Sequence, residues 1–192
     1  MVAEHQPRTI SVEEYFELEK NNPEICYEYI DGYVYMMAGG SFNHDTIKSN
    51  IQGILWTLLR GNKCRVYSSD MKTQISEKRY FHPDVTITCD PGDRGTGDLL
   101  KSPRVVFEVL SPTTEMIDRT WELQNYLALT TLEEYILIDS KSQKMELYRK
   151  EQNKWVYDAF NAEDEVELPT LGIRFPVADV YEDVIFDKEG QM

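Results

Sequence analysis

The sequence predicts a mixed α/β fold in which helices flank a mixed central β-sheet. Three observations support this prediction. One long segment, residues 43–60, carries apolar residues at helical spacing. Short runs rich in Val, Ile, Tyr and Phe are separated by Gly, Pro and Asp turn signals. These patterns follow one another in the order helix, strands, helix, strands, which is typical of helices packed on a sheet.

The chain has the length and composition of one globular domain. It has 192 residues, of which 41% are apolar and 28% are charged. No internal repeat, low-complexity segment or linker divides the chain, so we expect residues 1–192 to form a single domain.

The N-terminal part is expected to form a short helix and then a hairpin. Ser11 and Glu14 have the spacing of a capping box, which predicts a helix over residues 12–20. The segment 25–37 is rich in Tyr, Ile and Val and is interrupted by Asp31-Gly32, which predicts two paired strands.

The remaining elements follow from periodicity and from chain breakers. A core-facing helix is expected over residues 43–60, and Gly61-Asn62 ends it. A second helix is expected to begin at Thr113 or Thr114 and to run to about residue 129. Further strands are expected over residues 64–68, 72–76, 81–89, 104–110, 134–139, 144–149 and 155–160.

The cysteines indicate a reducing compartment. Cys26, Cys64 and Cys89 are odd in number, far apart and without a CxxC pair, which argues against a disulfide framework or a structural zinc site. We therefore expect a cytoplasmic protein. No apolar run approaches the roughly 20 residues needed to cross a bilayer, and the N-terminus lacks the apolar region of a signal peptide.

The charge of the chain argues against simple binding of a phosphate backbone. The net charge is −14, and nucleic-acid binders usually carry a basic face. The segment from Asp158 to the C-terminus contributes −8 of this charge. The remainder is only mildly acidic, so a local basic groove remains compatible with the composition.

Two acids stand inside apolar strand patterns. Asp84 lies in FHPDVTIT and Glu108 lies in RVVFEVL. A charge in an apolar strand costs free energy unless it is paired or holds a metal. Two such acids on consecutive strands can converge on one hard-oxygen site that suits Mg²⁺ or Mn²⁺. The alternative is that each acid pairs with a nearby arginine or lies at a sheet edge.

Four other polar residues are weaker candidates. Glu28 is either a third carboxylate of the site or a solvent-facing residue of an edge strand. His44 opens the long helix, where it can reach a phosphate, orient a carboxylate or simply be exposed. Asp118 and Glu122 share one helical face with Tyr126, and their spacing alone favours a solvated acidic face.

The first expected hairpin carries a stripe of tyrosines. Tyr27, Tyr29, Tyr33 and Tyr35 alternate along it. Such rings can stack on nucleic-acid bases. We prefer the alternative that they pack on a neighbouring strand or on a second subunit.

Four segments of the chain resemble a known family. They are YEYIDGYVYMMAGGSFNH, HPDVTI, VVFEVLSPTTEMIDR and NYLALTTLEEYILID. Together they resemble the Uma2 family (formerly DUF820), which is similar to PD-(D/E)XK nucleases. The resemblance runs from about residue 9 to 150 and continues more weakly through LGIRF.

The resemblance implies a restriction-endonuclease-like core, Mg²⁺-type metal binding and DNA phosphodiesterase activity. Asp84 and Glu108 resemble the two motif acids, and Glu28 resembles the acid from the N-terminal part of the core. His44 and Asp118 fall on recurrent polar positions of the family.

The chain departs from the family pattern where a lysine is expected. The motif position two residues after Glu108 is Leu110. Relatives often supply a lysine from the next helix instead, but that position here is Glu122. A lysine there would stabilise transition-state charge, and a glutamate reverses the sign. Lys72 or Lys101 is a candidate substitute from elsewhere in the chain.

Two functions are therefore considered. The first is a metal-dependent endonuclease in which Asp84 and Glu108 bind the ion, with Glu28 completing the site. The second is a catalytically inactive relative that keeps the fold as a binding or assembly module. We favour the first, with DNA as the partner, because an inactive site has no reason to keep costly buried acids. A homodimer is also expected, since an aromatic-rich hairpin and many short strands need their edges covered.

Overall fold

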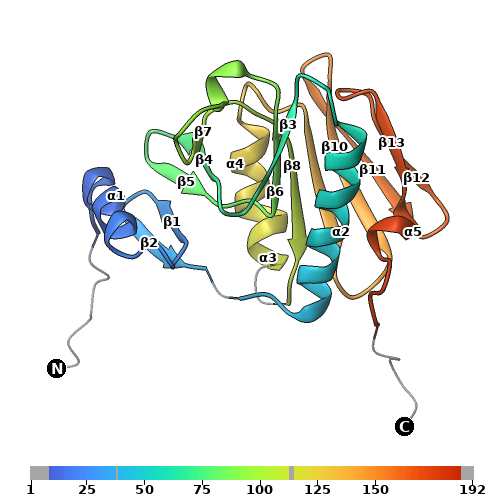
Figure 1. Ribbon diagram of the computed structural model, residues 1–192, viewed down its shortest axis with the longest axis horizontal. Coiled ribbons are helices and arrows are strands. Elements are labelled where there is room, and N and C mark those ends of the chain that lie inside the picture. The colour runs from blue at the N-terminus through green and yellow to red at the C-terminus, as the bar shows by residue number, and fades with distance from the viewer. Residues whose placement is uncertain (1–8, 38, 113–114, 187–192) are drawn as a thin grey trace, which may run out of the picture.

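The fold contains three sheets and several helices. It is described here from a computed structural model that describes residues 9–37, 39–112 and 115–186. A six-stranded sheet forms the centre, a five-stranded sheet lies toward the N-terminal part, and a two-stranded sheet comes from the C-terminal part (Figure 1). The prediction of a mixed α/β fold with helices flanking a mixed sheet is confirmed.

The six-stranded sheet mixes parallel and antiparallel neighbours. Its strand order is β11-β10-β9-β8-β6-β3, and β8 and β9 run parallel while the other neighbouring pairs are antiparallel. A parallel pair needs a crossover connection, and the chain between β8 and β9 provides it as a helix. The strand bounds are β3 Arg65–Ser68, β6 Val85–Thr88, β8 Pro103–Leu110, β9 Glu134–Asp139, β10 Lys144–Glu151 and β11 Lys154–Asn161.

Alternate residues of the central strands fill two separate cores. On β8, Val105, Phe107 and Val109 belong to one core, while Val106 and Leu110 belong to the other. Such alternation follows from the two-residue period of a strand. The first core is covered by α2 (Phe42–Leu58) and by the C-terminal elements β12 (Glu165–Leu168), β13 (Ile173–Pro176) and α5 (Val177–Val180).

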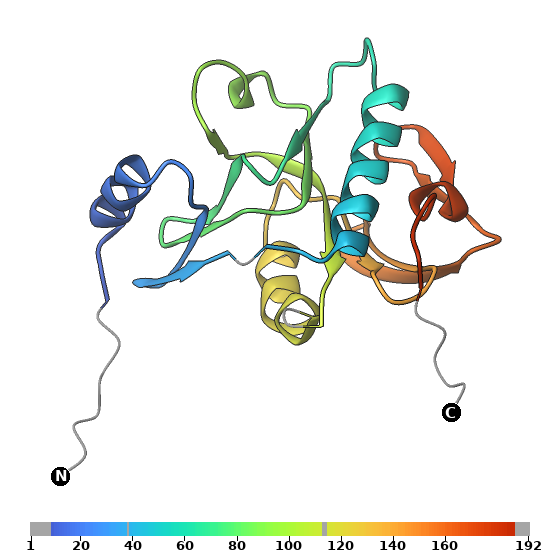
Figure 2. The same cartoon turned by 60° about the horizontal axis from the view of Figure 1, so that its bottom comes forward.

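The second core is covered by the crossover helix. This helix consists of α3 (Glu115–Ile117), a π-helical turn (Asp118–Glu122) and α4 (Leu123–Leu127). Figure 2 shows it on the opposite side of the sheet from α2. The expected start of this helix, at Thr113 or Thr114, lies outside the described residues.

None of the helices in the described part of the chain is both long and apolar enough to cross a membrane.

The five-stranded sheet carries the first hairpin. Its order is β2-β1-β5-β4-β7, and α1 packs on it through Tyr15, which contacts Tyr29 and Tyr80. Ser11 and Glu14 form the predicted capping box of α1. The bounds are α1 Val12–Asn21, β1 Tyr27–Ile30, β2 Tyr33–Met36, β4 Lys72–Ser76, β5 Arg79–Phe81 and β7 Leu99–Leu100.

The strand expected over residues 81–89 is two strands, so that prediction was wrong in one respect. β5 belongs to the five-stranded sheet and β6 to the six-stranded sheet. Pro83 lies between them and has no N–H to donate to a ladder, which suits a passage from one sheet to the other. Asp84 therefore lies in the bend before β6 and not inside a strand.

Cys64 and Cys89 form a disulfide, which the cysteine spacing argued against. The pairing of β3 with β6 places Arg65 opposite Thr88, so the residues just beyond that pair also face each other. The two cysteines are 25 residues apart in sequence, and their spacing does not indicate that they pair across β3 and β6. Cysteine spacing therefore no longer supports a reducing compartment, because disulfides persist in oxidising ones.

Glu134 is a fully buried acid at the start of β9. Its Oε1 lies 3.3 Å from Nε of Arg149 on β10. Burial raises the pKa of Glu134 to about 7, because the loss of solvation outweighs the attraction of Arg149. Between its ordinary pKa of 4.5 and about 7, the native state therefore binds more protons than the unfolded state.

We expect the free energy of unfolding to fall as the pH rises from about 4.5 to 7. At about 1.4 kcal/mol per pKa unit, the loss attributable to Glu134 is roughly 3 kcal/mol. Glu134→Gln should remove this pH dependence, and Glu133→Gln, which changes a more exposed neighbour, should keep it. Urea denaturation at several pH values measures the slopes, and equal slopes for wild type and Glu134→Gln would contradict the assignment.

Candidate functional site

Main-chain N–H groups bind the carboxylates of Asp84 and Glu108 where β6 meets β8. The N–H of Asp84 donates to Oε2 of Glu108 at 3.1 Å, and the N–H of Val109 donates to Oδ2 of Asp84 at 2.8 Å. The hydroxyl of Tyr126 on α4 donates to Oε1 of Glu108 at 3.1 Å. The antiparallel register pairs Val85 with Phe107 and so brings the two acids together. Both carboxylates are buried and held in place.

Asp118 and Glu122 are also buried, so the preference for a solvated face was wrong. Only 6% of Asp118 and 8% of Glu122 are exposed. They begin and end the π-helical turn, a wider turn that is rare and often found at functional sites. Together with Glu28, Asp84 and Glu108 they form the group that we call the acidic centre.

Burial and repulsion by neighbouring carboxylates raise the pKa values of the three glutamates of this centre. Burial raises the pKa of Glu108 well above its usual range, and the charges of Asp84, Glu122 and Asp118 add to this. The pKa of Glu122 is raised in the same way, by burial and then by Glu28 and its other neighbours. None of the described Lys or Arg side chains forms an ion pair with Glu28, Asp84, Glu108 or Glu122. These four acids therefore have no Lys or Arg partner in the part of the chain that the structure describes.

Glu28 belongs to this centre through the hairpin. It is half-buried, and burial raises its pKa, together with the charges of Asp118 and Asp84. The main-chain N–H of His82 donates to Oε1 of Glu28 at 3.1 Å and partly offsets this effect. The N-terminal acid is thus brought beside the two motif acids, although it comes from the other sheet.

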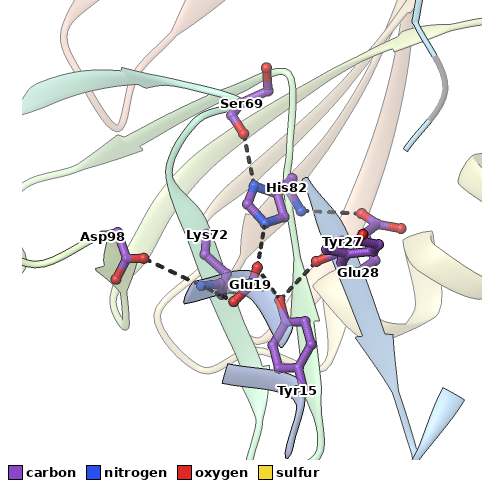
Figure 3. A network of polar contacts seen from close by, with 8 residues as sticks. All are labelled: Tyr15, Glu19, Tyr27, Glu28, Ser69, Lys72, His82 and Asp98. Atoms are coloured by element: carbon purple, nitrogen blue, oxygen red, sulfur yellow. Dashed lines mark hydrogen bonds and ion pairs between the residues drawn. The ribbon is translucent and has the colours of Figure 1, made fainter. Parts of the chain in front are cut away.

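A buried polar network holds His82 (Figure 3). Its Nδ1 lies 2.8 Å from the carbonyl oxygen of Ser69, and its Nε2 lies 3.6 Å from Glu19 on α1. Glu19 in turn lies 2.5 Å from Nζ of Lys72. This network joins α1, β4 and the chain beside Glu28. Glu19 and His82 were not identified from the sequence. A Glu in a helix and a His next to a Pro are common, and no motif links the two positions.

Arg79 joins the hairpin to the helix that carries Glu122. Its Nε donates to Oδ2 of Asp31 in the hairpin turn at 2.9 Å, and its Nη1 donates to Oδ1 of Asn125 at 2.6 Å. This link between the β1–β2 turn and α4 holds Glu28 and Glu122 in the same region of the molecule.

His44 contributes a cation-capable side chain that is paired with Asp84 of the acidic centre. Its Nε2 lies 3.2 Å from Oδ2 of Asp84. Burial lowers the pKa of His44, but the hydrogen bond and the charge of Asp84 outweigh this, so the pKa is raised. Of the roles open to His44 from sequence, this contact favours the orientation of a carboxylate.

Gly40 makes room for the ring of His44. A Cβ at Gly40 would lie 2.6 Å from Nδ1 and 2.9 Å from Cγ of His44, closer than Cβ atoms come to other atoms. A Cβ at Gly39 would meet nothing within 4 Å. The two glycines look alike in sequence and differ only in what surrounds them.

The candidate substitute lysines do not pair with the acidic centre. Leu110 is buried in the core below α4. Lys72 is buried in the ion pair with Glu19, on the α1 side of the five-stranded sheet. Lys101 is exposed, and its main-chain N–H bonds to Asp93.

The acids of the centre are close together but not arranged as a preformed set of ligands. Among the described residues, no group of three or more His, Cys, Asp or Glu lies in a geometry that could hold a metal ion. Main-chain N–H groups bond to one oxygen of Asp84 and to one oxygen of Glu108.

The tyrosine stripe divides between the two faces of the hairpin. Tyr29 is buried against Tyr15 and Tyr80, as expected for packing. Tyr33 and Tyr35 are exposed on β2. The preferred interpretation of the stripe therefore holds for Tyr29 but leaves the two rings of β2 unexplained.

Comparisons with known proteins agree on the fold and the family. The Uma2 family model, described as "Putative restriction endonuclease", matches residues 12–178. A solved structure titled as a putative nuclease belonging to DUF820, from Anabaena variabilis ATCC 29413, has a TM-score of 0.73. It is 18% identical, and the match covers 92% of this chain and 99% of that one.

Two curated relatives come from Synechocystis sp. (strain ATCC 27184 / PCC 6803 / Kazusa). "Uncharacterized protein slr1290" is 37% identical over 179 residues, which cover 92% of this chain and 94% of the relative. "Uncharacterized protein sll1609" is 27% identical over 171 residues, which cover 86% and 96%. Both similarities extend over nearly the whole length of each relative.

We expect Gly40→Ala to displace His44 with little effect on folding. The side chain of His44 can rotate away from the new methyl group. The clash therefore changes the position of the ring more than it changes the free energy of unfolding. The pKa of His44, followed by NMR, should fall below its wild-type value because the contact with Asp84 is lost while burial continues to lower it. Gly39→Ala should leave the pKa unchanged. A wild-type pKa in Gly40→Ala would mean that the ring does not depend on this glycine.

Proposed function

The chain belongs to the Uma2 family, and from this premise we propose that it is a metal-dependent endonuclease that hydrolyses phosphodiester bonds in DNA. The observation that carries the proposal is the pair of Asp84 and Glu108, two buried carboxylates that accept hydrogen bonds from the main-chain N–H groups of Val109 and Asp84, respectively. A fold has no need of such a pair at a sheet junction, because burying like charges without a cation is unfavourable.

The chemistry of the acidic centre fits a hard divalent cation. Carboxylate oxygens are the donors that Mg²⁺ and Mn²⁺ prefer. The raised pKa values of Glu28 and Glu108 reflect repulsion and burial that a cation would relieve. We propose that Asp84 and Glu108 hold Mg²⁺ or Mn²⁺ and that Glu28 completes the set. Such an ion supplies charge neutralisation at a phosphoryl oxygen and acidifies water.

Other residues of the chain would orient these ligands. His44 holds the carboxylate of Asp84, and Tyr126 holds that of Glu108. Asp118 and Glu122 add negative charge that strengthens attraction for a cation and weakens it for a phosphate. These residues hydrogen-bond the carboxylates that would bind the metal. Loss of such a residue typically changes metal affinity or activity 10- to 100-fold.

The missing lysine favours weak activity. Leu110 and Glu122 occupy the two positions where relatives place a lysine, and Lys72 is held by Glu19. These observations also support the alternative of a catalytically inactive module that binds or assembles. We favour the nuclease because the acidic centre keeps its costly burial, which a binding role does not require.

We expect Mn²⁺ to bind the native protein and to support cleavage of DNA. Calorimetric titration should show binding in the wild type and its loss in Asp84→Ala and in Glu108→Gln. Asp158→Asn, a change at an exposed acid of β11, serves as the control for charge. Cleavage is assayed on single- and double-stranded DNA with Mg²⁺ and Mn²⁺. Equal Mn²⁺ binding by wild type and Asp84→Ala would refute the site, and binding without any cleavage would favour the inactive module.

We expect Glu122→Lys to increase cleavage. A cation in this position can stabilise transition-state charge, and one preorganised donor is worth on the order of 10²-fold. Gln124→Lys places a lysine on the exposed side of the same helix and should have no such effect. The double variant with Asp84→Ala should lose the gain. If the wild type cleaves well and Glu122→Lys cleaves at the same rate, another group already stabilises the transition-state charge.

We also propose that the chain forms a homodimer through the free edge of β2. This strand is the edge of the five-stranded sheet, and its unpaired main-chain groups can pair with those of a second copy. Light scattering should then give a mass near twice the 22.4 kDa of one chain. A mass of one chain at every working concentration would contradict this proposal.

A further inference from the structure

Tyr35 lies on the same face of the hairpin as Glu28. In the register of β1 and β2, Tyr35 is directly opposite Glu28, and Tyr33 is directly opposite Ile30. Residues opposite each other in an antiparallel pair point to the same side, with Cβ atoms about 5 Å apart. Glu28 is the least buried acid of the acidic centre, and 52% of Tyr35 is exposed. The ring therefore borders the centre on its more open side.

The ring of Tyr35 is not explained by packing. Tyr29, on the other face of the hairpin, lies 5.0 Å from the ring of Tyr15. No such neighbour accompanies the rings of Tyr33 and Tyr35 among the described residues. Exposed aromatic rings that gather beside polar groups are typical of binding surfaces.

Other exposed apolar side chains lie close in sequence to residues of the acidic centre. Phe42 is 95% exposed and comes two residues before His44 on α2. Met116 is 79% exposed and comes two residues before Asp118 on the crossover helix. Three different segments that supply polar groups to the site thus also present an apolar side chain to solvent.

The charges near the site disfavour recognition through phosphates. The chain carries a net charge of −14, and none of the described Lys or Arg side chains pairs with Glu28, Asp84, Glu108 or Glu122. Stacking on an aromatic ring supplies an attraction that needs no positive side chain, because every base has a π-face. In a duplex these faces are already stacked within the helix, so only unpaired bases offer them.

We infer that the acidic centre acts on DNA with unpaired bases, and that Tyr35 stacks on a base beside the cleaved bond. The inference rests on the proposed nuclease function and names its substrate class. Tyr35 is then a residue that determines specificity by distinguishing single strands from duplexes.

Binding and cleavage of DNA test this inference separately. Fluorescence anisotropy with a labelled single-stranded oligonucleotide and its duplex, in Ca²⁺, measures affinity apart from hydrolysis. The wild type should bind the single strand at least about tenfold more tightly than the duplex. Tyr35→Ala should weaken single-strand binding roughly 5- to 100-fold, and Tyr35→Trp should retain it. Tyr157→Ala on β11 is the matched control, since Tyr157 is also 52% exposed.

The outcomes separate this inference from the nuclease proposal. Equal affinity for single strand and duplex, or no effect of Tyr35→Ala, would overturn the inference and leave the nuclease intact. Tyr35-dependent binding without cleavage in Mn²⁺ would overturn the nuclease and keep only the role of Tyr35 in binding single strands, and the absence of any binding would overturn both. A dimer that dissociates in Tyr35→Ala with unchanged DNA affinity would assign the ring to a subunit contact. Tyr35→Thr, which keeps a strand-forming residue, repeats the test if alanine destabilises the hairpin.

Discussion

The burial of several like charges in one place is the constraint on which the rest of this site depends. Asp84, Glu108, Asp118 and Glu122 are all buried, and burial together with the charges of these neighbours raises the pKa values of Glu108 and Glu122. Such an arrangement is stable only if main-chain donors, protonation or a bound cation compensates for it. Main-chain N–H groups already bond to Asp84 and Glu108, but the pKa of Glu108 is still raised, because burial outweighs the hydrogen bond that its carboxylate accepts.

The surrounding structure holds these charges in position from several directions. The junction of the two sheets at Pro83 places Asp84 beside Glu108, and the π-helical turn brings Asp118 and Glu122 inward. His82 connects Glu28 to the Glu19–Lys72 ion pair, so that α1 is coupled to the site through a buried network (Figure 3). Breaking one partner of such a network is costly, because the other charge is then left buried and unpaired.

For the nuclease function that we propose, the departure from the family pattern changes how a substrate would be recognised. A lysine beside two carboxylates attracts a phosphate, whereas Glu122 repels it. Exposed apolar side chains such as Tyr35, Phe42 and Met116 come from the segments around the carboxylates. A site of this composition suits cation-mediated contact with one phosphate and stacking with a neighbouring base. It suits tracking along a duplex less well, since that depends on many phosphate contacts.

The sequence by itself determined the fold class, most element positions and the two motif acids. Capping at Ser11, the turn at Asp31-Gly32 and the apolar period of α2 are local signals, and local signals act through neighbouring residues alone. The tertiary structure decided what depends on register and on approach between distant segments. These features are the disulfide between Cys64 and Cys89, the inward face of Asp118 and Glu122, the contact of His44 with Asp84, and the opposition of Tyr35 to Glu28. The sequence around each of these residues contains no motif that would indicate the contact. A shift of one residue in strand pairing would abolish the cross-strand contacts and would leave the local pattern of turns and apolar residues unchanged.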